Sequence, residues 1–328
     1  MDLKLVSEKF NTEAKCISYL EELRWGKSKK PKQCLNCGSE NIRFDKSEKR
    51  YACNQCKHKF SVTTGTIFEH TRYKFTAWFK VITLILNAKQ GLSAANIWRN
   101  MNCSYKTAWY LAMRVRCAMV DDCIELQNIV EFDEAYIGGK PRKTTKNQDE
   151  NSQAFLSSVE TVNKRGRGTK KAKIVGVVER NGKVVLRVVE RIDSKILLKM
   201  LNEYVKKDDA IVVSDDFKAY KAFDKVVAHL TIDHSKEFSK GIVHINTIEG
   251  FWAIVKNSIR GQYISLSKKY LPFYLVQAQY IYNRRNAKHD VFEEFLRNAV
   301  SENKCLLYYK PKQEVKKIVY RGKKKGKC

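Results

Sequence analysis

Three acidic residues in the second half of the sequence could together hold divalent cations. Asp133 follows the apolar run NIVEF, Asp215 ends the run AIVVS, and Glu249 lies in the segment HINTIEGFWAIVK. Carboxylates held close together can bind a pair of Mg²⁺ ions, which activate an attacking oxygen and stabilise a leaving oxygen in phosphodiester chemistry. These residue types therefore predict a metal-dependent site that cuts or joins nucleic-acid strands.

The strand pattern limits which neighbouring acids could share this site. Glu131 lies two residues before Asp133 and shares its strand face, whereas Glu134 should point away. Asp216 is an alternative to Asp215, although it should face the opposite side if the strand continues. Each acid taken alone is more typical of a solvated surface, and only the three together favour a metal site.

The helix that carries Glu249 adds further candidates. Lys256 follows Glu249 by seven residues, two helical turns along the same face, and could contact a DNA phosphate. Arg260, next to the glycine at which the helix should end, is another candidate DNA contact. The spacing Asn246-x-x-Glu249 also fits a capping box, in which Glu249 would only satisfy backbone groups at the helix start.

Two cysteine pairs predict a structural zinc site. Cys34-x-x-Cys37 and Cys53-x-x-Cys56 enclose 15 residues, which fits the spacing of four-cysteine zinc sites. Zinc would then supply much of the folding free energy of a module too small to have its own core. His58 is an alternative fourth ligand. The alternative to a metal site is four reduced cysteines that are buried as small hydrophobic side chains. The module could contact DNA or act as a spacer.

Residues 91–116 favour a helix-turn-helix. Ser93 and Ser104 can each cap the start of a helix. In this motif the N-terminal residues of the second helix face the major groove, which makes candidate DNA contacts of Ser104, Tyr105, Lys106 and Thr107. Trp98 and Trp109 are expected in the core. An ordinary helical hairpin is the alternative.

The charge of the chain points to a polyanionic partner. The 328 residues include 63 Lys and Arg against 35 Asp and Glu, a net charge of +28. Such a protein should bind nucleic acid by releasing counterions. No basic amphipathic helix favours a membrane surface, and no apolar stretch of about 18 residues predicts a membrane span. Six scattered cysteines beside the two pairs favour a reducing, intracellular compartment.

The apolar patterns predict an α/β multidomain protein. Two strand patterns, AKIVGVVER and KVVLRVVE, flank Asn181-Gly182, a dipeptide typical of tight hairpin turns. A helical stretch (193–207), the strand AIVV, the short helix FKAYKAF, the strand KVVAHLTI and the helix starting near Asn246 follow. With the strand before Asp133, the order is β-β-β-α-β-α-β-α, that of a mixed-sheet ribonuclease H-like core.

The predicted division of the chain follows these patterns. We expect an N-terminal helical lead, a zinc ribbon, a helical region with the helix-turn-helix, a catalytic domain and a basic tail, with bounds 1–30, 31–66, 67–125, 126–290 and 291–328. A basic insertion at 138–171 interrupts the catalytic domain and fits poorly, since loops of that length are uncommon in compact domains.

Several motifs together resemble a known family. YACNQCKHKFSVTTGTIFEHTR, GLSAANIW, SYKTAW, VEFDEAYIGGK, SDDFKAY, HINTIEGFWAIVK and YIYNRR occur in family order, from about Cys34 to Arg285. They resemble the DDE transposases of bacterial insertion sequences related to Merlin transposons, with an ISXO2-like transposase domain. The insertion after Gly139 departs from compact members of that family.

The resemblance implies a ribonuclease H-like core, dependence on Mg²⁺ or Mn²⁺, and movement of an element bounded by terminal inverted repeats. By position, Asp133, Asp215 and Glu249 match the first, second and third acids, and Lys256 the basic residue that follows. Because some relatives carry Asn as the third ligand, Asn246 is kept as an accessory.

The implied partners are double-stranded DNA, both inverted repeats and target, and further copies of the chain, because two ends must be handled together. No membrane partner is expected. The protein should act in the bacterial cytoplasm, associated with the nucleoid, or in the nucleus if it is eukaryotic. A structure-specific nuclease without strand transfer, or an inactive DNA-binding regulator derived from a transposase, are the alternatives.

Overall fold

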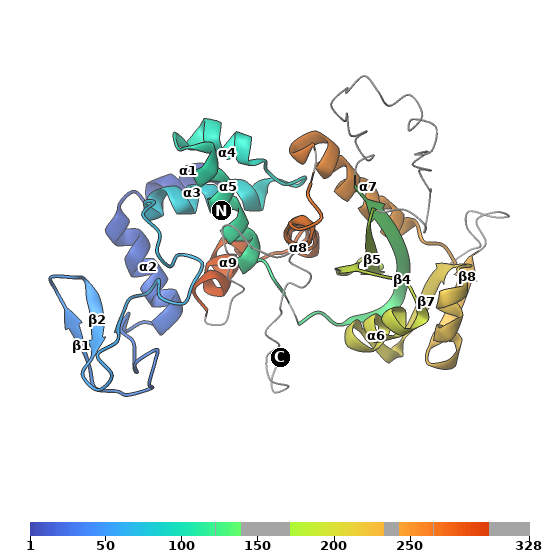
Figure 1. Ribbon diagram of the computed structural model, residues 1–328, viewed down its shortest axis with the longest axis horizontal. Coiled ribbons are helices and arrows are strands. Elements are labelled where there is room, and N and C mark those ends of the chain that lie inside the picture. Colours follow the sequence, from blue (N-terminus) through green and yellow to red (C-terminus); the bar gives the residue numbers. More distant parts are fainter. Residues whose placement is uncertain (122, 139–170, 233–242, 265, 302–328) are drawn as a thin grey trace, which may run out of the picture. The chain divides into compact units, whose positions relative to one another are not determined.

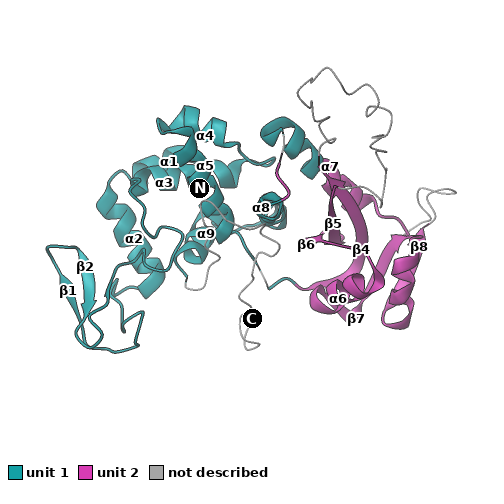
Figure 2. Cartoon of the chain, viewed as in Figure 1, with its two compact units in different colours: residues 1–124, 254–264, 269–328 teal, residues 125–253, 265–268 magenta. Residues whose placement is uncertain are grey.

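A computed structural model describes residues 1–121, 123–138, 171–232, 243–264 and 266–301. The chain forms two compact units (Figure 2). Unit 1 comprises residues 1–124, 254–264 and 269–328, and unit 2 comprises residues 125–253 and 265–268. No helix in the described ranges combines the length and apolar character needed to cross a membrane.

Unit 1 is built mainly from helices around one hydrophobic core (Figure 1). Its helices are α1 Leu3–Lys9, α2 Glu13–Trp25, α3 Phe75–Asn87, α4 Ala94–Met101, α5 Tyr105–Ala118, α8 Leu271–Asn283 and α9 Val291–Val300. The sequence of α3, FTAWFKVITLILN, is apolar on almost every side, and seven of its side chains are buried. A helix that is apolar all round must be surrounded by others, which places α3 at the centre of the core.

Both ends of the described chain contribute to this core, which differs from the predicted division. Phe10, from the expected N-terminal lead, packs edge-on against Phe79 with ring centroids 4.9 Å apart and also contacts Phe292 of α9. The segment at 291–300, expected to begin a basic tail, is therefore a packed helix. Helix α8, expected in the catalytic domain, also belongs to unit 1, because Phe273 and Tyr280 are buried in the same core.

A small three-stranded antiparallel sheet holds the cysteine pairs. Its strands are β1 Ile42–Asp45, β2 Arg50–Cys53 and β3 Lys59–Phe60. The end of α2 holds this sheet: Trp25 packs edge-on against Tyr51 at 5.4 Å, and the Arg24 guanidinium donates to the carbonyl of Val62 at 2.6 Å.

Unit 2 is built on a five-stranded mixed sheet of order β6-β5-β4-β7-β8. The strands are β4 Leu126–Ile137, β5 Ala172–Glu179, β6 Val184–Val189, β7 Val205–Asp215 and β8 Ala228–Ile232. β4, β5 and β6 pair antiparallel, whereas β7 and β8 run parallel to β4. A hairpin joins β5 and β6 as predicted, but the backbone N–H of Gly182 donates to the carbonyl of Glu179 at 2.9 Å, so the turn centres on Arg180 and Asn181 and not on the predicted Asn-Gly pair. Asn181 has a positive φ of 58°, whereas Gly182 is not among the residues with positive φ, as a type I′ Asn-Gly turn would require.

The helices of unit 2 connect these strands in the predicted order. α6 Ser194–Tyr204 precedes β7, and α7 Asn246–Ser258 follows β8. The predicted short helix after β7 is a 3₁₀ helix, η2 Lys218–Lys225, and α7 continues into a π-helical turn, η3 Ile259–Tyr263. The order β-β-β-α-β-α-β-α is thus confirmed with that one change. The basic insertion at 139–170 and the tail at 302–328 lie outside the described residues.

Candidate active site and DNA-contacting surfaces

Two of the predicted acids lie on neighbouring strands of the large sheet. β4 and β7 are parallel neighbours, and Glu131 of β4 is opposite Val213 of β7. Asp133 lies two residues further along β4 and Asp215 two residues further along β7, and the charge of Asp215 reaches the Asp133 carboxyl. The carboxyl ends of parallel strands meet at one edge of a sheet and are a common place for ligand sites.

The electrostatics of Asp133 reflect this neighbour. Burial raises the pKa of the Asp133 carboxyl from 3.8 to about 7, and the negative charges of Glu134 and Asp215 add to the rise. Hydrogen bonds from the Glu134 backbone and the Trp252 indole oppose it. A carboxyl destabilised by burial and by a second carboxylate gains from a nearby cation, so this pair fits a divalent metal.

Neighbouring acids on β4 serve different elements, as strand alternation predicts. Asp133 accepts a hydrogen bond from the indole Nε1 of Trp252 on α7 at 2.9 Å. Glu134 instead accepts one from the hydroxyl of Tyr220 on η2 at 3.0 Å. Glu134 therefore points away from the Asp133 face, as expected.

The end of β7 is held by a chain of polar contacts. The Ser214 hydroxyl donates to the carbonyl of Asp215 and contacts Nε2 of His229, each at 2.9 Å, and Nδ1 of His229 meets Asp224 at 2.5 Å. The backbone N–H of Phe217 donates to the Asp215 carboxylate at 3.2 Å. This serine, histidine and aspartate resemble a hydrolase triad, but Ser214 is fully buried and cannot act as a nucleophile. Their place in the fold is to fix the strand end that carries Asp215.

Glu131 holds the start of α7 against β4. Its carboxylate is completely buried and accepts hydrogen bonds from the Thr247 hydroxyl at 3.0 Å and the backbone N–H of Ile248 at 2.9 Å. It also forms an ion pair with Arg180 at 2.6 Å, and Arg180 in turn donates to the carbonyl of His244 at 2.7 Å. A carboxylate at a helix N-terminus satisfies free amides and complements the helix dipole.

Glu249 is not used as a helix cap, so the capping-box alternative is wrong. The two backbone amides that such a box would pair have other partners: the N–H of Glu249 donates to the carbonyl of Ile245 at 3.1 Å, and that of Asn246 to Nδ1 of His244 at 3.4 Å. The Glu249 side chain is exposed, and within the described residues it has no hydrogen-bonding or ionic partner.

The three acids are not gathered as closely as the cysteines. Among the residues that the structure describes, only the four cysteines bring three or more ligand atoms within reach of one ion. Three like charges repel one another, so a close cluster without cations is not expected. Asp133 and Asp215 are close enough to interact electrostatically, whereas the approach of Glu249 to them remains a prediction.

The remaining candidates on this helical segment are exposed. Asn246 is the first residue of α7, Lys256 lies in its last turn and Arg260 lies in η3. All three side chains face solvent. Their predicted roles as an accessory ligand and as DNA contacts remain predictions.

The four cysteines form the predicted cluster. Their Sγ atoms all lie within 4.8 Å of one another, and the pairs Cys34–Cys56 and Cys37–Cys53 are each 3.6 Å apart. A hydrogen bond from the backbone of His58 is the main cause that lowers the pKa of the Cys56 thiol to about 6. Thiolates are the form that binds zinc. His58 lies outside this cluster, so the all-cysteine site is the one that the fold assembles.

The helix-turn-helix prediction agrees with the local structure. The Ser93 and Ser104 hydroxyls cap α4 and α5, accepting from the amides of Asn96 at 3.2 Å and Thr107 at 3.1 Å. Asn102 between the helices has a left-handed backbone, with φ at 45°. Tyr105 is 55% exposed and Lys106 is also exposed, whereas Thr107 is partly buried.

One expectation for this region is wrong. Trp98, predicted in the core, is 46% exposed on α4. Trp109 does pack inward, edge-on against Tyr270 with ring centroids 5.2 Å apart. In α4 the apolar stripe is short, and Ile97 alone supplies its fully buried contact, so the tryptophan beside it turns outward.

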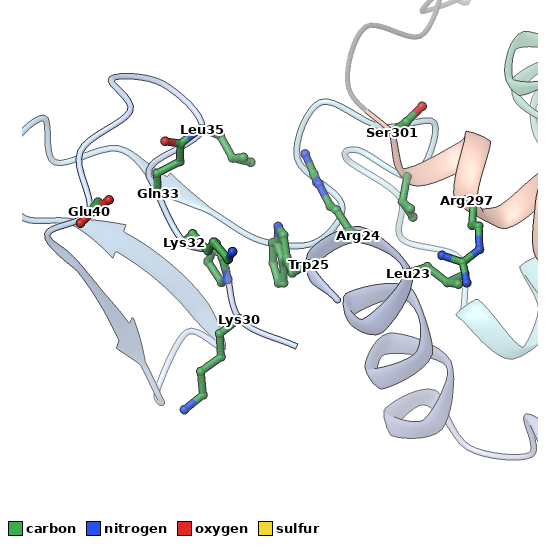
Figure 3. Close-up of a pocket in the computed structure, with 12 residues that line it drawn as sticks. Leu23, Arg24, Trp25, Lys30, Lys32, Gln33, Leu35, Glu40, Arg297 and Ser301 are labelled. Atoms are coloured by element: carbon green, nitrogen blue, oxygen red, sulfur yellow. The ribbon is translucent and has the colours of Figure 1, made fainter. Parts of the chain in front are cut away.

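A cavity of about 710 Å³ lies between the cysteine-bearing sheet, the end of α2 and the end of α9. Figure 3 shows Lys30 and Lys32 on the segment that enters the sheet, with Arg24 and Trp25 across from them. Lys30 and Lys32 are exposed, and Arg297 on α9 adds a further positive charge to the lining. This basic hollow beside the ribbon was not predicted from the sequence.

Two residues of the candidate active site were also missed. Arg180 follows β5 in the hairpin, and nothing in the local pattern separates it from the many surface arginines. Gly176 interrupts the apolar run AKIVGVVE. An isolated glycine inside a strand often marks close approach of another group, and this signal could have identified it.

Two family models match the chain. The ISXO2-like transposase domain matches residues 125–283, which include β4, β7 and α7. The transposase zinc-ribbon domain matches residues 11–59, which include α2 and the four cysteines.

Two curated relatives are also named as transposase-like or transposable-element proteins. An uncharacterized transposase-like protein of Haemophilus influenzae is 30% identical over 33% of this chain and 88% of its own length. An uncharacterized protein in the transposable element ISH50 of Halobacterium salinarum is 24% identical over 75% of this chain and 83% of its own length.

Two solved structures were also found, a pre-cleavage Mos1 transpososome and a Mos1 strand transfer complex. Each covers 70% of this chain, at 12% and 13% identity, and the matches cover 78% and 74% of those chains. Their TM-scores of 0.25 and 0.27 are too low to establish a shared fold. The two family models and the Haemophilus influenzae relative show that the chain belongs to the ISXO2-like transposase family with a transposase zinc ribbon.

Proposed function

We propose that the protein is the transposase of an insertion sequence, which binds terminal inverted repeats and catalyses metal-dependent cleavage and transfer of DNA strands. In this proposal unit 2 is a ribonuclease H-like catalytic core. The observation that supports it is that Asp133 and Asp215 lie on neighbouring parallel strands, near enough for the charge of Asp215 to add to the raised pKa of Asp133.

The roles of the acids follow from their environments. Asp133, within β4, and Asp215, at the end of β7, would hold Mg²⁺ or Mn²⁺, and Glu249 on α7 would complete the set. Divalent metal in such a site activates an attacking oxygen and stabilises a leaving one. Because Asp133 is partly buried and beside a second carboxylate, its charge is best balanced by a cation. Asn246 would be an accessory ligand beside Glu249, and Lys256 would contact a DNA phosphate.

Recognition of DNA would fall to unit 1. The four cysteines would hold Zn²⁺ and so stabilise the small sheet against α2. The exposed start of α5, with Ser104, Tyr105 and Lys106, would enter the major groove. Arg260 would add a phosphate contact. Handling two element ends would require more than one copy of the chain, acting in the bacterial cytoplasm where the DNA lies.

Incubation of the purified protein with Mg²⁺ and its own inverted-repeat ends tests the proposal. The expected product is a 3′ end of the element joined to target DNA. Asp133→Asn should abolish cleavage and joining while DNA affinity stays similar or rises, because the change removes one negative charge near the phosphates. Cleavage by Asp133→Asn at the wild-type rate would refute the assignment of the metal site.

The same assay separates the alternative activities. Cleavage without any joined product would support a structure-specific nuclease. Specific binding without either reaction, at all Mg²⁺ and Mn²⁺ concentrations, would support a regulator that has lost the chemistry. The intact set of Asp133, Asp215 and Glu249 argues against an inactive regulator.

A further inference from the structure

We propose that Trp252 is a positioning residue for the first metal-binding acid, and that Gly176 exists to seat its indole ring. The inference rests on the proposed function, since it concerns how Asp133 is presented to a cation. Both residues lie outside the acidic set, and their roles can be measured through metal binding itself.

The first observation is a direct contact. Trp252 is almost fully buried, at 3% exposure, and its indole N–H donates to Oδ2 of Asp133 at 2.9 Å. An indole has one donor and no acceptor, and a carboxylate has about four acceptor sites, so this bond holds Oδ2 in place and leaves acceptor sites for a cation. A hydrogen bond of this kind fixes the orientation of a metal ligand and is a recurrent feature of metal sites.

The second observation explains how so large a ring fits there. Gly176 of β5 is the cross-strand partner of Asp133. A Cβ placed on Gly176 would lie 2.6 Å from Cζ2 of Trp252 and 3.0 Å from Cδ1 of Ile248. No side chain can occupy that position without moving α7. The glycine therefore creates the gap over the sheet through which the indole reaches Asp133.

The third observation fixes the register of the helix. Glu131 binds the amide of Ile248, and Asp133, two residues along the same strand face, binds Trp252, four residues along the helix. One turn of α7 therefore advances about as far as two residues of β4, so the two contacts follow one another along the helix and the strand. Glu249 lies between Ile248 and Trp252 in sequence, so these two hydrogen bonds also hold the third acid in place.

Replacing Trp252 with Phe tests the role of the indole N–H, because the ring packing is largely kept. The full-length, zinc-loaded protein should bind Mn²⁺, measured by calorimetry without DNA, about 10- to 100-fold more weakly. Cleavage should recover at high Mn²⁺ concentration, because the acids themselves remain. DNA affinity without divalent metal should not change.

Trp78→Phe is the matched control. Trp78 is also fully buried, and its Nε1 donates to the Thr71 hydroxyl at 2.9 Å, within unit 1. The control loses the same kind of bond far from the acids along the chain, so its Mn²⁺ affinity should equal that of the wild type. Equal Mn²⁺ affinities for Trp252→Phe and the wild type would overturn the inference.

A second pair of variants tests the same inference if Trp252→Phe fails to fold. Gly176→Ala should displace the indole and weaken Mn²⁺ binding to a similar degree, whereas Gly250→Ala, on the open face of the same helix, should not. Normal Mn²⁺ binding by Gly176→Ala would contradict the seating role. If Asp133→Asn also leaves Mn²⁺ binding unchanged, the proposed metal site fails first, which distinguishes that failure from failure of the positioning role.

Discussion

The buried carboxylate of Glu131 accepts a hydrogen bond from the backbone N–H of Ile248 at 2.9 Å, although the two residues are 117 positions apart. This bond caps helix α7 with a side chain from strand β4. Because β4 carries Asp133 and α7 carries Glu249, the contact joins the two elements that a metal site would need. The ion pair with Arg180 balances the buried charge.

Glu131→Gln should destabilise unit 2. The change leaves Arg180, which is 16% exposed in its side chain, without its anionic partner. Loss of one partner of a buried ion pair costs about 3 kcal/mol. Denaturant unfolding should show this loss, and Glu190→Gln, at an exposed site after β6, should change the unfolding free energy by less than about 0.5 kcal/mol. Equal stabilities of the two variants would contradict a structural role for Glu131.

The raised pKa of Asp133 predicts how stability depends on pH without divalent cations. Folding raises this pKa to about 7, so the folded state holds the proton more tightly than the unfolded state. The contribution is fully present below about pH 4 and is lost as pH rises through about 7. Thermal unfolding between pH 4 and 8 should show this loss for the wild type and a weaker one for Asp133→Asn, which has no proton to release.

Added Mg²⁺ should reverse that trend above pH 7, because a cation stabilises the ionised carboxylate. The wild type should then gain stability on addition of Mg²⁺ and Asp133→Asn should gain much less. If the unfolding midpoint of the wild type changed with neither pH nor Mg²⁺ across this range, the predicted titration of Asp133 would be ruled out.

The cysteine cluster should hold about one zinc ion per chain. Cys34→Ser combined with Cys37→Ser should remove it, because two of four thiolate ligands are lost, and should loosen the small sheet from α2. Elemental analysis measures the zinc, and protease cleavage within residues 31–60 measures the loosening. Cys123→Ser, an exposed cysteine outside the cluster, should keep its zinc. If the double variant retained its zinc, the assignment of the zinc site to these four cysteines would be wrong.

The basic hollow beside the ribbon should contribute phosphate contacts. Lys30→Ala combined with Lys32→Ala should weaken binding to DNA of any sequence and reduce the slope of log affinity against log salt by about 2, one for each lost contact. Lys195→Ala with Lys199→Ala, exposed on α6, is the charge-matched control. An identical decrease in slope for both pairs would mean that the effect comes from net charge and not from this surface.

Local patterns in the sequence were enough to predict the elements and the cysteine site. The hairpin between β5 and β6, the serine caps at Ser93 and Ser104, and the order of strands before and after Asp215 all depend on residues a few positions apart. The four cysteines follow the same logic, since CxxC spacing fixes each pair and a short hairpin brings the pairs together.

The tertiary structure decided what surrounds those residues. Trp252 meets Asp133 across 119 positions, and Arg180 meets His244 across 64. The membership of α8 and α9 in the core of unit 1 is equally distant from any local signal. Such contacts depend on which face of a helix docks on which strand, and that choice is made by the packing of whole elements. The sequence by itself determined which side chains could bind metal or DNA, and only the fold determined which other side chains hold them in position.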